Sequence, residues 1–143
     1  MSLLVVGPNA IPSRVDPVLV RQAALAAATG LAEQAIFMNA HVAAITIEKI
    51  SYHPSLSIAG NDLNNFVMNV RKRDAAGGAP SILTSYVNNV ASGGLMAFVE
   101  KNLGGISTPL VVVGGGITIE VVKNGTGMLL PSGSLYIRYR LGP

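Results

Sequence analysis

The amino-acid sequence predicts a mainly β protein: an antiparallel β-sandwich or barrel with an extended N-terminal arm and one short helix. Two observations favour this class. From about residue 35 onward, hydrophobic and polar residues alternate in short segments, and clusters of Gly, Pro, Asn and Ser separate these segments. No internal repeat or charged linker divides the 143 residues, so we expect a single domain over residues 16–143.

An extended arm is predicted for residues 1–15. Pro8 and Pro12 prevent a regular helix there and disfavour an interior strand. A disordered terminus is the alternative, but a free tail seldom carries consecutive large apolar residues. We therefore expect the arm to bind a partner through its apolar side chains. These are Leu3, Leu4, Val5, Val6 and Ile11.

The short helix is predicted after Asp16 and Pro17, which suit the N-cap and the first helical position. Local propensity favours helix over residues 18–29, and Gly30 suits the position that follows a helix. The competing interpretation is an extended strand that runs into residues 34–38.

No targeting or membrane-spanning segment is expected. Gly7 and Pro8 stop the apolar run at the N-terminus. The Ala-rich stretch 23–28 lies between Arg21 and Glu33, and it is too short to cross a membrane.

The first strong β segment, residues 43–52, changes face midway. Its first two isoleucines alternate on one face, whereas Ile50 and Tyr52 follow the alternation of the other face. We therefore expect a β-bulge or a sheet edge at Glu48-Lys49.

Further elements follow from the same alternation. Half-buried strands are predicted at residues 66–73 and 81–87, with a Gly/Ala loop at 74–80 between them. Residues 95–99 fit one or two amphipathic turns of helix. Residues 110–113 form an apolar run that is typical of a fully buried strand.

The last part of the chain carries strong turn signals. Gly114-Gly115-Gly116 indicates a bend at which the chain changes sheets. Asn124-Gly125 predicts a hairpin, and Pro131-Ser132-Gly133 predicts a second tight turn. The final strand is expected to point four side chains inward. These are Leu135, Ile137, Tyr139 and Leu141.

Few charged residues are available to keep a surface in water. They make up 12% of the chain, against about 25% in typical proteins, whereas hydrophobic residues make up 50%. We therefore expect other protein chains to cover much of the surface. The net charge of +3 is small, and Arg71-Lys72-Arg73 has the character of a solvated strand end, so no nucleic-acid partner is expected.

No catalytic, metal or cofactor site is predicted, and the protein is not expected to be an enzyme. Cysteine is absent, which excludes a thiolate nucleophile or metal ligand. His41 and His53 lack the partner residues of a metal or catalytic motif. Asp62 is expected to cap backbone amides in an Asx turn. Gly114-Gly115-Gly116 lacks the spacing of a phosphate-binding loop.

Three stretches of the sequence, residues 45–66, 66–73 and 111–139, share a pattern of strands and turns with a known family. After the strand at 45–50, the chain enters the turn Gly60-Asn61-Asp62-Leu63-Asn64. Later it passes through Gly125-Thr126-Gly127 and Leu130-Pro131-Ser132-Gly133 into the final strand. Over about residues 40–140 this pattern resembles the small jelly-roll decoration, or cement, proteins of tailed-phage capsids. The residues assigned to structural turns are Gly60, Asp62, Asn64, Gly125, Gly127, Pro131 and Gly133.

The resemblance implies a jelly-roll-like sandwich that forms a homo-oligomer, a trimer, on the outer surface of a virion. Its partners would be further copies of itself and the major capsid protein, with no membrane involved. The protein would be made in the host cytoplasm, and the arm would grip the capsid. Deleting residues 1–15 is then expected to weaken attachment while leaving the domain folded.

Three alternatives remain at this stage. A ligand- or carbohydrate-binding module of a host-recognition appendage would present exposed aromatic residues, which are scarce here: four Tyr, three Phe and no Trp. A self-assembling coat or tail-tube subunit would form shells or tubes unaided. A small cupin-like enzyme would need clustered His and Glu ligands inside the barrel.

Overall fold

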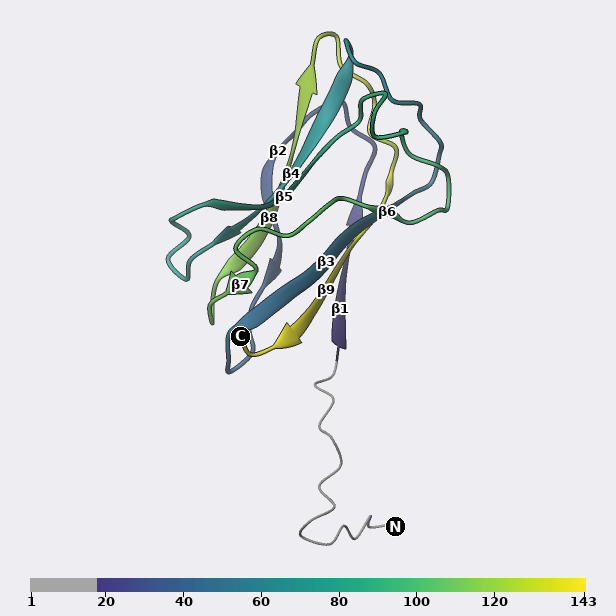
Figure 1. The fold of residues 1–143 in the computed structure, drawn as a ribbon. Helices are drawn as coiled ribbons and strands as arrows, with labels where there is room; N and C mark the ends of the chain where they lie inside the picture. The colour runs from purple at the N-terminus through teal and green to yellow at the C-terminus, as the bar shows by residue number, and fades with distance from the viewer. Residues whose placement is uncertain (1–17) are drawn as a thin grey trace, which may run out of the picture.

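The chain folds into two antiparallel sheets that pack face to face (Figure 1). The structure, a computed structural model, describes residues 18–143. Its strands are β1 (Val18–Leu25), β2 (Leu31–Met38), β3 (Ile45–Pro54), β4 (Asn65–Arg73), β5 (Ser81–Val87), β6 (Lys101–Asn102), β7 (Leu110–Val111), β8 (Gly116–Asn124) and β9 (Gly133–Leu141). The first sheet has the order β1-β9-β3-β6, with β7 also paired to β3, and the second sheet has the order β2-β8-β4-β5.

The strand pairing is nested, which is the mark of a jelly roll. β1 pairs with β9, β2 with β8, β3 with β6 and β7, and β4 with β5, as in one long hairpin wound around the sandwich. The expected antiparallel jelly-roll-like β-sandwich is therefore confirmed. The strand β1 begins beside the end of β9, so residue 18 and the C-terminus lie at the same end of the sandwich (Figure 1). We call this the lower end and the opposite one the upper end.

The core lies between the sheets, and alternation fills it from both sides. Ile137 of β9 and Ile119 of β8 are fully buried. The bulge predicted at Glu48-Lys49 is confirmed by a register shift between Ile47 and Lys49. Because a bulge inserts one residue into the alternation, all four large apolar residues of β3 face the core rather than opposite faces. These are Ile45, Ile47, Ile50 and Tyr52.

The predicted helix at residues 18–29 is wrong, because this segment forms β1 and the turn that follows it. The preference of Ala and Leu for helix amounts to a few tenths of a kcal/mol per residue. Pairing of all eight residues of β1 with β9 outweighs that preference, since it satisfies the backbone groups along one edge of β1 and buries Leu25. Nor do residues 95–99 form helical turns. Leu95 forms an isolated bridge with Ile58 instead.

Two of the turns at which the chain passes from one sheet to the other were predicted from the sequence. The bend predicted at Gly114-Gly115-Gly116 is confirmed, because β7 lies in the first sheet and β8 in the second. The hairpin predicted at Asn124-Gly125 is wrong. A turn is present, closed by the Gly127 N–H donating to the Asn124 carbonyl at 3.0 Å, but β8 and β9 belong to different sheets.

Two burial predictions also need correction. In the run 110–113 only Val111 is buried, because β7 is an edge strand of two residues and the side chains of Leu110, Val112 and Val113 face water. Leu141, the last residue of β9, is exposed, whereas Leu135, Ile137 and Tyr139 point inward as expected. Edges and strand ends expose residues that alternation alone would bury.

The predicted arm lies outside the described residues, and so do its apolar residues Leu3, Leu4, Val5, Val6 and Ile11. Within residues 18–143 no helix is long and apolar enough to cross a membrane.

Candidate interaction surfaces

The two histidines lie at opposite ends of the first sheet. His41, in the loop after β2, has its Nε2 atom 3.0 Å from the Tyr139 hydroxyl. His53, near the end of β3, packs edge-on against Tyr136 with ring centroids 4.7 Å apart. Within the part of the chain that the structure describes, no three His, Asp or Glu side chains come together as a metal site would require.

The acidic side chains of residues 18–143 are all engaged in holding the fold. Each one accepts a hydrogen bond or lies within ion-pair distance of an arginine or lysine. They are Glu33, Glu48, Asp62, Asp74, Glu100 and Glu120.

A polar network crosses the outer face of the second sheet. Glu33 of β2 binds Arg73 of β4 through two hydrogen bonds of 2.8 and 2.7 Å, and the Thr118 hydroxyl of β8 donates to the same carboxylate. These hydrogen bonds, first that of Arg73 and then that of Thr118, lower the pKa of Glu33 from 4.5 to about 2. Glu120 joins Arg71 and Asn69 in the same way.

A shallow groove of about 330 Å³ lies on the outer face of the first sheet. The carboxylate of Glu100 lines this groove and is held by two hydrogen bonds. Lys49 donates to one of its oxygens at 2.6 Å, and Ser51 donates to the other at 2.9 Å. These two hydrogen bonds, that of Lys49 first, lower the pKa of Glu100. His53 and Tyr136 form the aromatic side of the groove.

The upper end brings predicted turn residues together. Asp62 accepts a hydrogen bond from the Val90 N–H, so it caps the loop after β5 rather than its own Asx turn. Asn61 accepts the Asx-turn hydrogen bonds instead, from the N–H groups of Leu63 and Asn64. Asn64 in turn accepts two hydrogen bonds from Thr126.

The turn glycines and Pro131 sit where backbones nearly touch. A Cβ on Gly60 would lie 1.9 Å from the Asn89 carbonyl oxygen, and one on Gly133 would lie 2.2 Å from that of His53. Gly125 and Gly127 both have positive φ angles, of 63° and 77°. The carbonyl of Pro131 accepts a 2.6 Å hydrogen bond from the buried Tyr52 hydroxyl, so these turns anchor the upper end to the core.

The loop 95–99, also at the upper end, displays an apolar side chain on a strained backbone. Phe98 is 81% exposed and has a φ of 60°, in the left-handed region that bulky residues rarely occupy. The loop is nevertheless held firmly, because the Phe98 N–H donates to the Pro54 carbonyl and the Ala97 N–H donates to the Ser57 hydroxyl, both at 2.8 Å. A hydrophobic ring is thus fixed in water.

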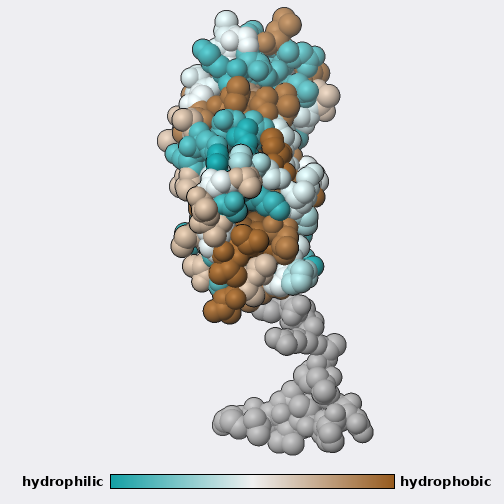
Figure 2. Space-filling view, turned by 90° about the vertical axis from the view of Figure 1, so that its left-hand side faces the viewer, coloured by the Kyte–Doolittle hydropathy of each residue, from teal (hydrophilic) through white to brown (hydrophobic). Residues whose placement is uncertain are grey.

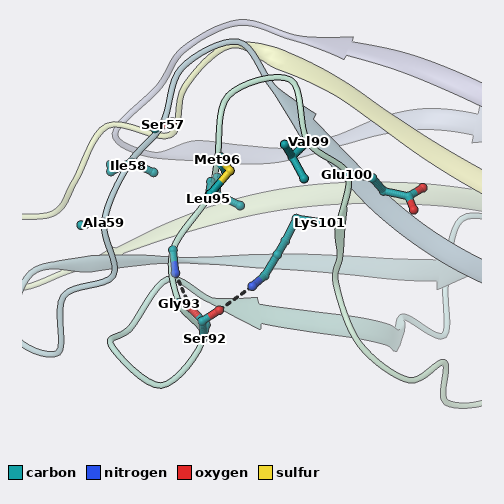
Figure 3. Close-up of a pocket in the computed structure, with 11 residues that line it drawn as sticks. Ser57, Ile58, Ala59, Ser92, Gly93, Leu95, Met96, Val99, Glu100 and Lys101 are labelled. Carbon is teal, nitrogen blue, oxygen red and sulfur yellow. Dashed lines mark hydrogen bonds between the residues drawn. The ribbon is translucent and has the colours of Figure 1, made fainter.

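A cavity of about 460 Å³ adjoins this loop (Figure 3). Ile58, Leu95, Met96 and Val99 supply its apolar wall. Lys101 extends across it, with its ammonium group donating to the Ser92 carbonyl and lying 5.6 Å from the centre of the Tyr86 ring. The cavity therefore offers an apolar hollow to which the same loop contributes Leu95, Met96 and Val99.

The lower end is a second apolar surface, built on a buried polar anchor. Asn39 is fully buried, and its amide group lies 3.1 Å from the carbonyl oxygens of Ala43, Val111 and Val112. This anchor ties the loop after β2 to the bend before β8. Large hydrophobic side chains project from these segments and from the strand ends beside them, and Figure 2 shows hydrophobic surface at this end. The exposed ones are Val18, Met38, Val42, Leu110, Val112, Val113 and Leu141.

Comparison with protein-family models, curated proteins and solved structures finds no match to this chain.

Three important residues escape sequence analysis. Phe98 follows no turn signal, because its conformation is unusual for phenylalanine. Asn39 and Asn88 are both fully buried, yet each directly follows the last residue of a strand, where an asparagine is usually exposed. An asparagine at such a position followed by a bend is a weak signal for a loop anchor.

Proposed function

We propose that the protein is a non-enzymatic structural protein of a virion, which decorates the outer surface of a phage capsid and stabilises it by bridging major capsid subunits. The observation that carries the proposal is the exposed apolar surface at both ends of the sandwich. Large hydrophobic side chains fixed in contiguous exposed patches are typical of protein–protein contact sites. The jelly roll supports the proposal less strongly, because this fold serves many functions.

The way the chain uses its charges supports a contact role. The carboxylates of residues 18–143 bind partners within the fold, so few charges remain to hydrate the surface. Covering such an exterior with other chains is favourable. It lowers the free energy by about 25 cal/mol for each Å² of apolar surface removed from water. We infer a homo-oligomer, a trimer as the family resemblance implies, with the apolar tetrad Leu3–Val6 reaching a capsid subunit.

Co-sedimentation tests the proposal directly. Virus particles from the culture that produces the chain are separated on a sucrose gradient, and a gold-labelled antibody against the chain is applied to them. We expect the chain to sediment with assembled capsids and the label to lie on their outer surface. Capsids that sediment without the chain, or label confined to disrupted particles, would overturn the proposal.

Substitutions identify the surface that makes contact. Phe98→Ser removes an exposed apolar side chain from the upper end, and Val42→Ser removes one from the lower end. Because both side chains are exposed, each variant is expected to fold normally while at least one loses capsid attachment. Lys123→Ser, at an exposed polar position at the end of β8, is the matched control and should attach as the wild type does. Full attachment of both apolar variants would contradict the assignment of the two ends.

Light scattering of the full chain tests self-association. We expect a discrete oligomer. Shells or tubes formed by the purified chain alone would favour the alternative of a coat or tail-tube subunit, and a strict monomer at high concentration would contradict self-association.

One observation favours a second candidate, a ligand-binding role. The groove on the first sheet combines an aromatic pair, His53 and Tyr136, with the hydrogen-bonding groups of Lys49, Glu100 and Arg138, which suits a polar ligand such as a sugar. A glycan array tests this role. Binding that disappears in Tyr136→Ala would support it, and an array without hits would remove it.

A further inference from the structure

Among the described residues, the strand β1 forms one edge of the first sheet. It pairs with β9 over all eight residues, from Val18 opposite Arg140 to Leu25 opposite Gly133, without a register shift. It is the terminal strand of the first sheet (Figure 1), and no other described residue pairs with its second edge. Unpaired backbone N–H and C=O groups along such an edge form a template for another strand.

The other three sheet edges are protected. β2 carries two register shifts against β8, and bulges of this kind disrupt further pairing. β5 also has a register shift, and the loop beyond it covers its edge through the Ser107 N–H, which donates to the Leu83 carbonyl at 2.8 Å. The far edge of the first sheet consists of β6 and β7, with two residues each. Only β1, among the described strands, is both long and regular at its outer edge.

The residues of β1 do not discourage pairing. The strand contains neither Pro nor Gly, and its one charge is Arg21. Proteins usually protect an exposed edge with several charges or a proline. Val20 is 59% exposed on the outer face of the strand, so an incoming strand would cover it.

We propose that β1 pairs with β1 of a second copy of this chain, antiparallel about a two-fold axis through Gln22. Residues directly opposite each other in a sheet share a face, so a two-fold axis must pass through a residue pair rather than between two pairs. An axis through Gln22 pairs residues 19–25 of both copies. It places Leu19 opposite Leu25 on the inner side and Val20 opposite Ala24 on the outer side.

Charge selects this register over its neighbour. An axis through Arg21 would set two arginines directly opposite each other, which is destabilising. With the axis at Gln22, Arg21 lies opposite the small Ala23 of the other copy and can keep its place over the Phe37 ring, 5.9 Å from the ring centre. The contact is isologous, so it joins copies in pairs and stops there.

This pairing goes beyond the proposed function, because it does not depend on what the assembly coats. A two-fold contact cannot close a trimer, so a trimer would use a different surface, and both contacts together would link trimers. Loss of capsid attachment and loss of β1 pairing are therefore separate outcomes.

Cysteine cross-linking tests the register in the full chain, which has no cysteine of its own. Opposite residues in an antiparallel pair have Cα atoms about 4.5–5.5 Å apart, within the range that a disulfide spans. We expect Gln22→Cys to form a covalent dimer under mild oxidation at low protein concentration. Gln34→Cys, at an exposed position on the protected strand β2, is the matched control and should form no covalent dimer. The proposal would be overturned if Gln22→Cys formed no covalent dimer, or if both variants formed equal amounts of covalent dimer.

A second variant measures the contact without a cross-link. Val20→Lys adds an exposed charge to the outer face of β1 and leaves the core intact, so the chain should fold and its dimer should dissociate at least about tenfold more readily in sedimentation. An unchanged dissociation constant would overturn the proposal. So would a mixture of Gln22→Cys and Val5→Cys chains that yields only mixed disulfides, because the N-terminal segment would then occupy the edge.

Discussion

The interior and the exterior of this sandwich follow opposite rules. Inside, the two sheets bring fully buried residues such as Phe66 and Ile137 together, and every buried side-chain N or O atom of the described residues has a hydrogen-bond partner. Outside, the side chains of Phe98 and Val42 are largely exposed to water. The interior therefore accounts for folding, whereas the apolar exterior adds nothing to the stability of a single chain.

This difference separates stability from function. A residue that the fold does not need, held on a strained backbone as Phe98 is, costs free energy in the isolated chain. Such a cost is offset when another molecule covers the ring. The same reasoning applies to the open edge of β1, because a protein that acted alone would gain by protecting it.

The largest effect is expected inside. Ile137→Ala in β9 leaves a cavity between the sheets and should lower the free energy of unfolding by about 2–5 kcal/mol. Leu141→Ala in the same strand is the matched control, and it should change stability by no more than about 0.5 kcal/mol because Leu141 is exposed. Urea denaturation of both variants checks the pair. Equal losses would show that strand ends are as well packed as the core.

A smaller, pH-dependent effect is expected on the outer face of the second sheet. The pKa of Glu33 is lowered from 4.5 to about 2 in the folded chain, first by the hydrogen bond from Arg73. Its carboxylate therefore stabilises the fold above pH 4.5, and this contribution is lost as the pH falls from 4.5 to about 2. Glu33→Gln should be less stable than the wild type near neutral pH, and the gap in urea midpoints should close in acid. A gap that stays constant with pH would contradict this assignment.

The smallest effect is expected at the upper end. Phe98→Gly relieves the positive φ and removes only an exposed ring, so it should raise the free energy of unfolding by at most about 1 kcal/mol. Phe98→Ala keeps the strained backbone and should stay within about 0.5 kcal/mol of the wild type. Thermal unfolding checks both variants. A marked loss of stability in Phe98→Gly would show that the ring packs within the single chain.

Most strands of the fold were predictable because their side chains alternate strongly. Phe66, Met68 and Val70 are buried in β4 as their spacing indicates, and the bulge after Ile47 follows from the break in alternation. The segment that became β1 was not predictable, because Ala and Leu suit a helix and its partner β9 lies at the other end of the chain. Local preference cannot anticipate a contact between the two ends of a sequence.

The candidate surfaces were predictable only in general terms. A low share of charged residues indicates a surface that other chains cover, but it does not say which part. The loop that presents Phe98 depends on hydrogen bonds to Pro54 and Ser57, far away in the sequence. Turn residues such as Asp62 and Asn64 were recognisable as turns, yet their partners Val90 and Thr126 were not.

The sequence by itself determined a β protein with an apolar interior, because the two-residue period of its apolar side chains suits only a sheet with one buried face. Only the tertiary structure decided which strands pair, where the chain changes sheets, and that residues 18–25 form a strand at the edge of a sheet. Those outcomes depend on contacts between distant segments, whose free energies compete with local preferences of a few tenths of a kcal/mol and exceed them.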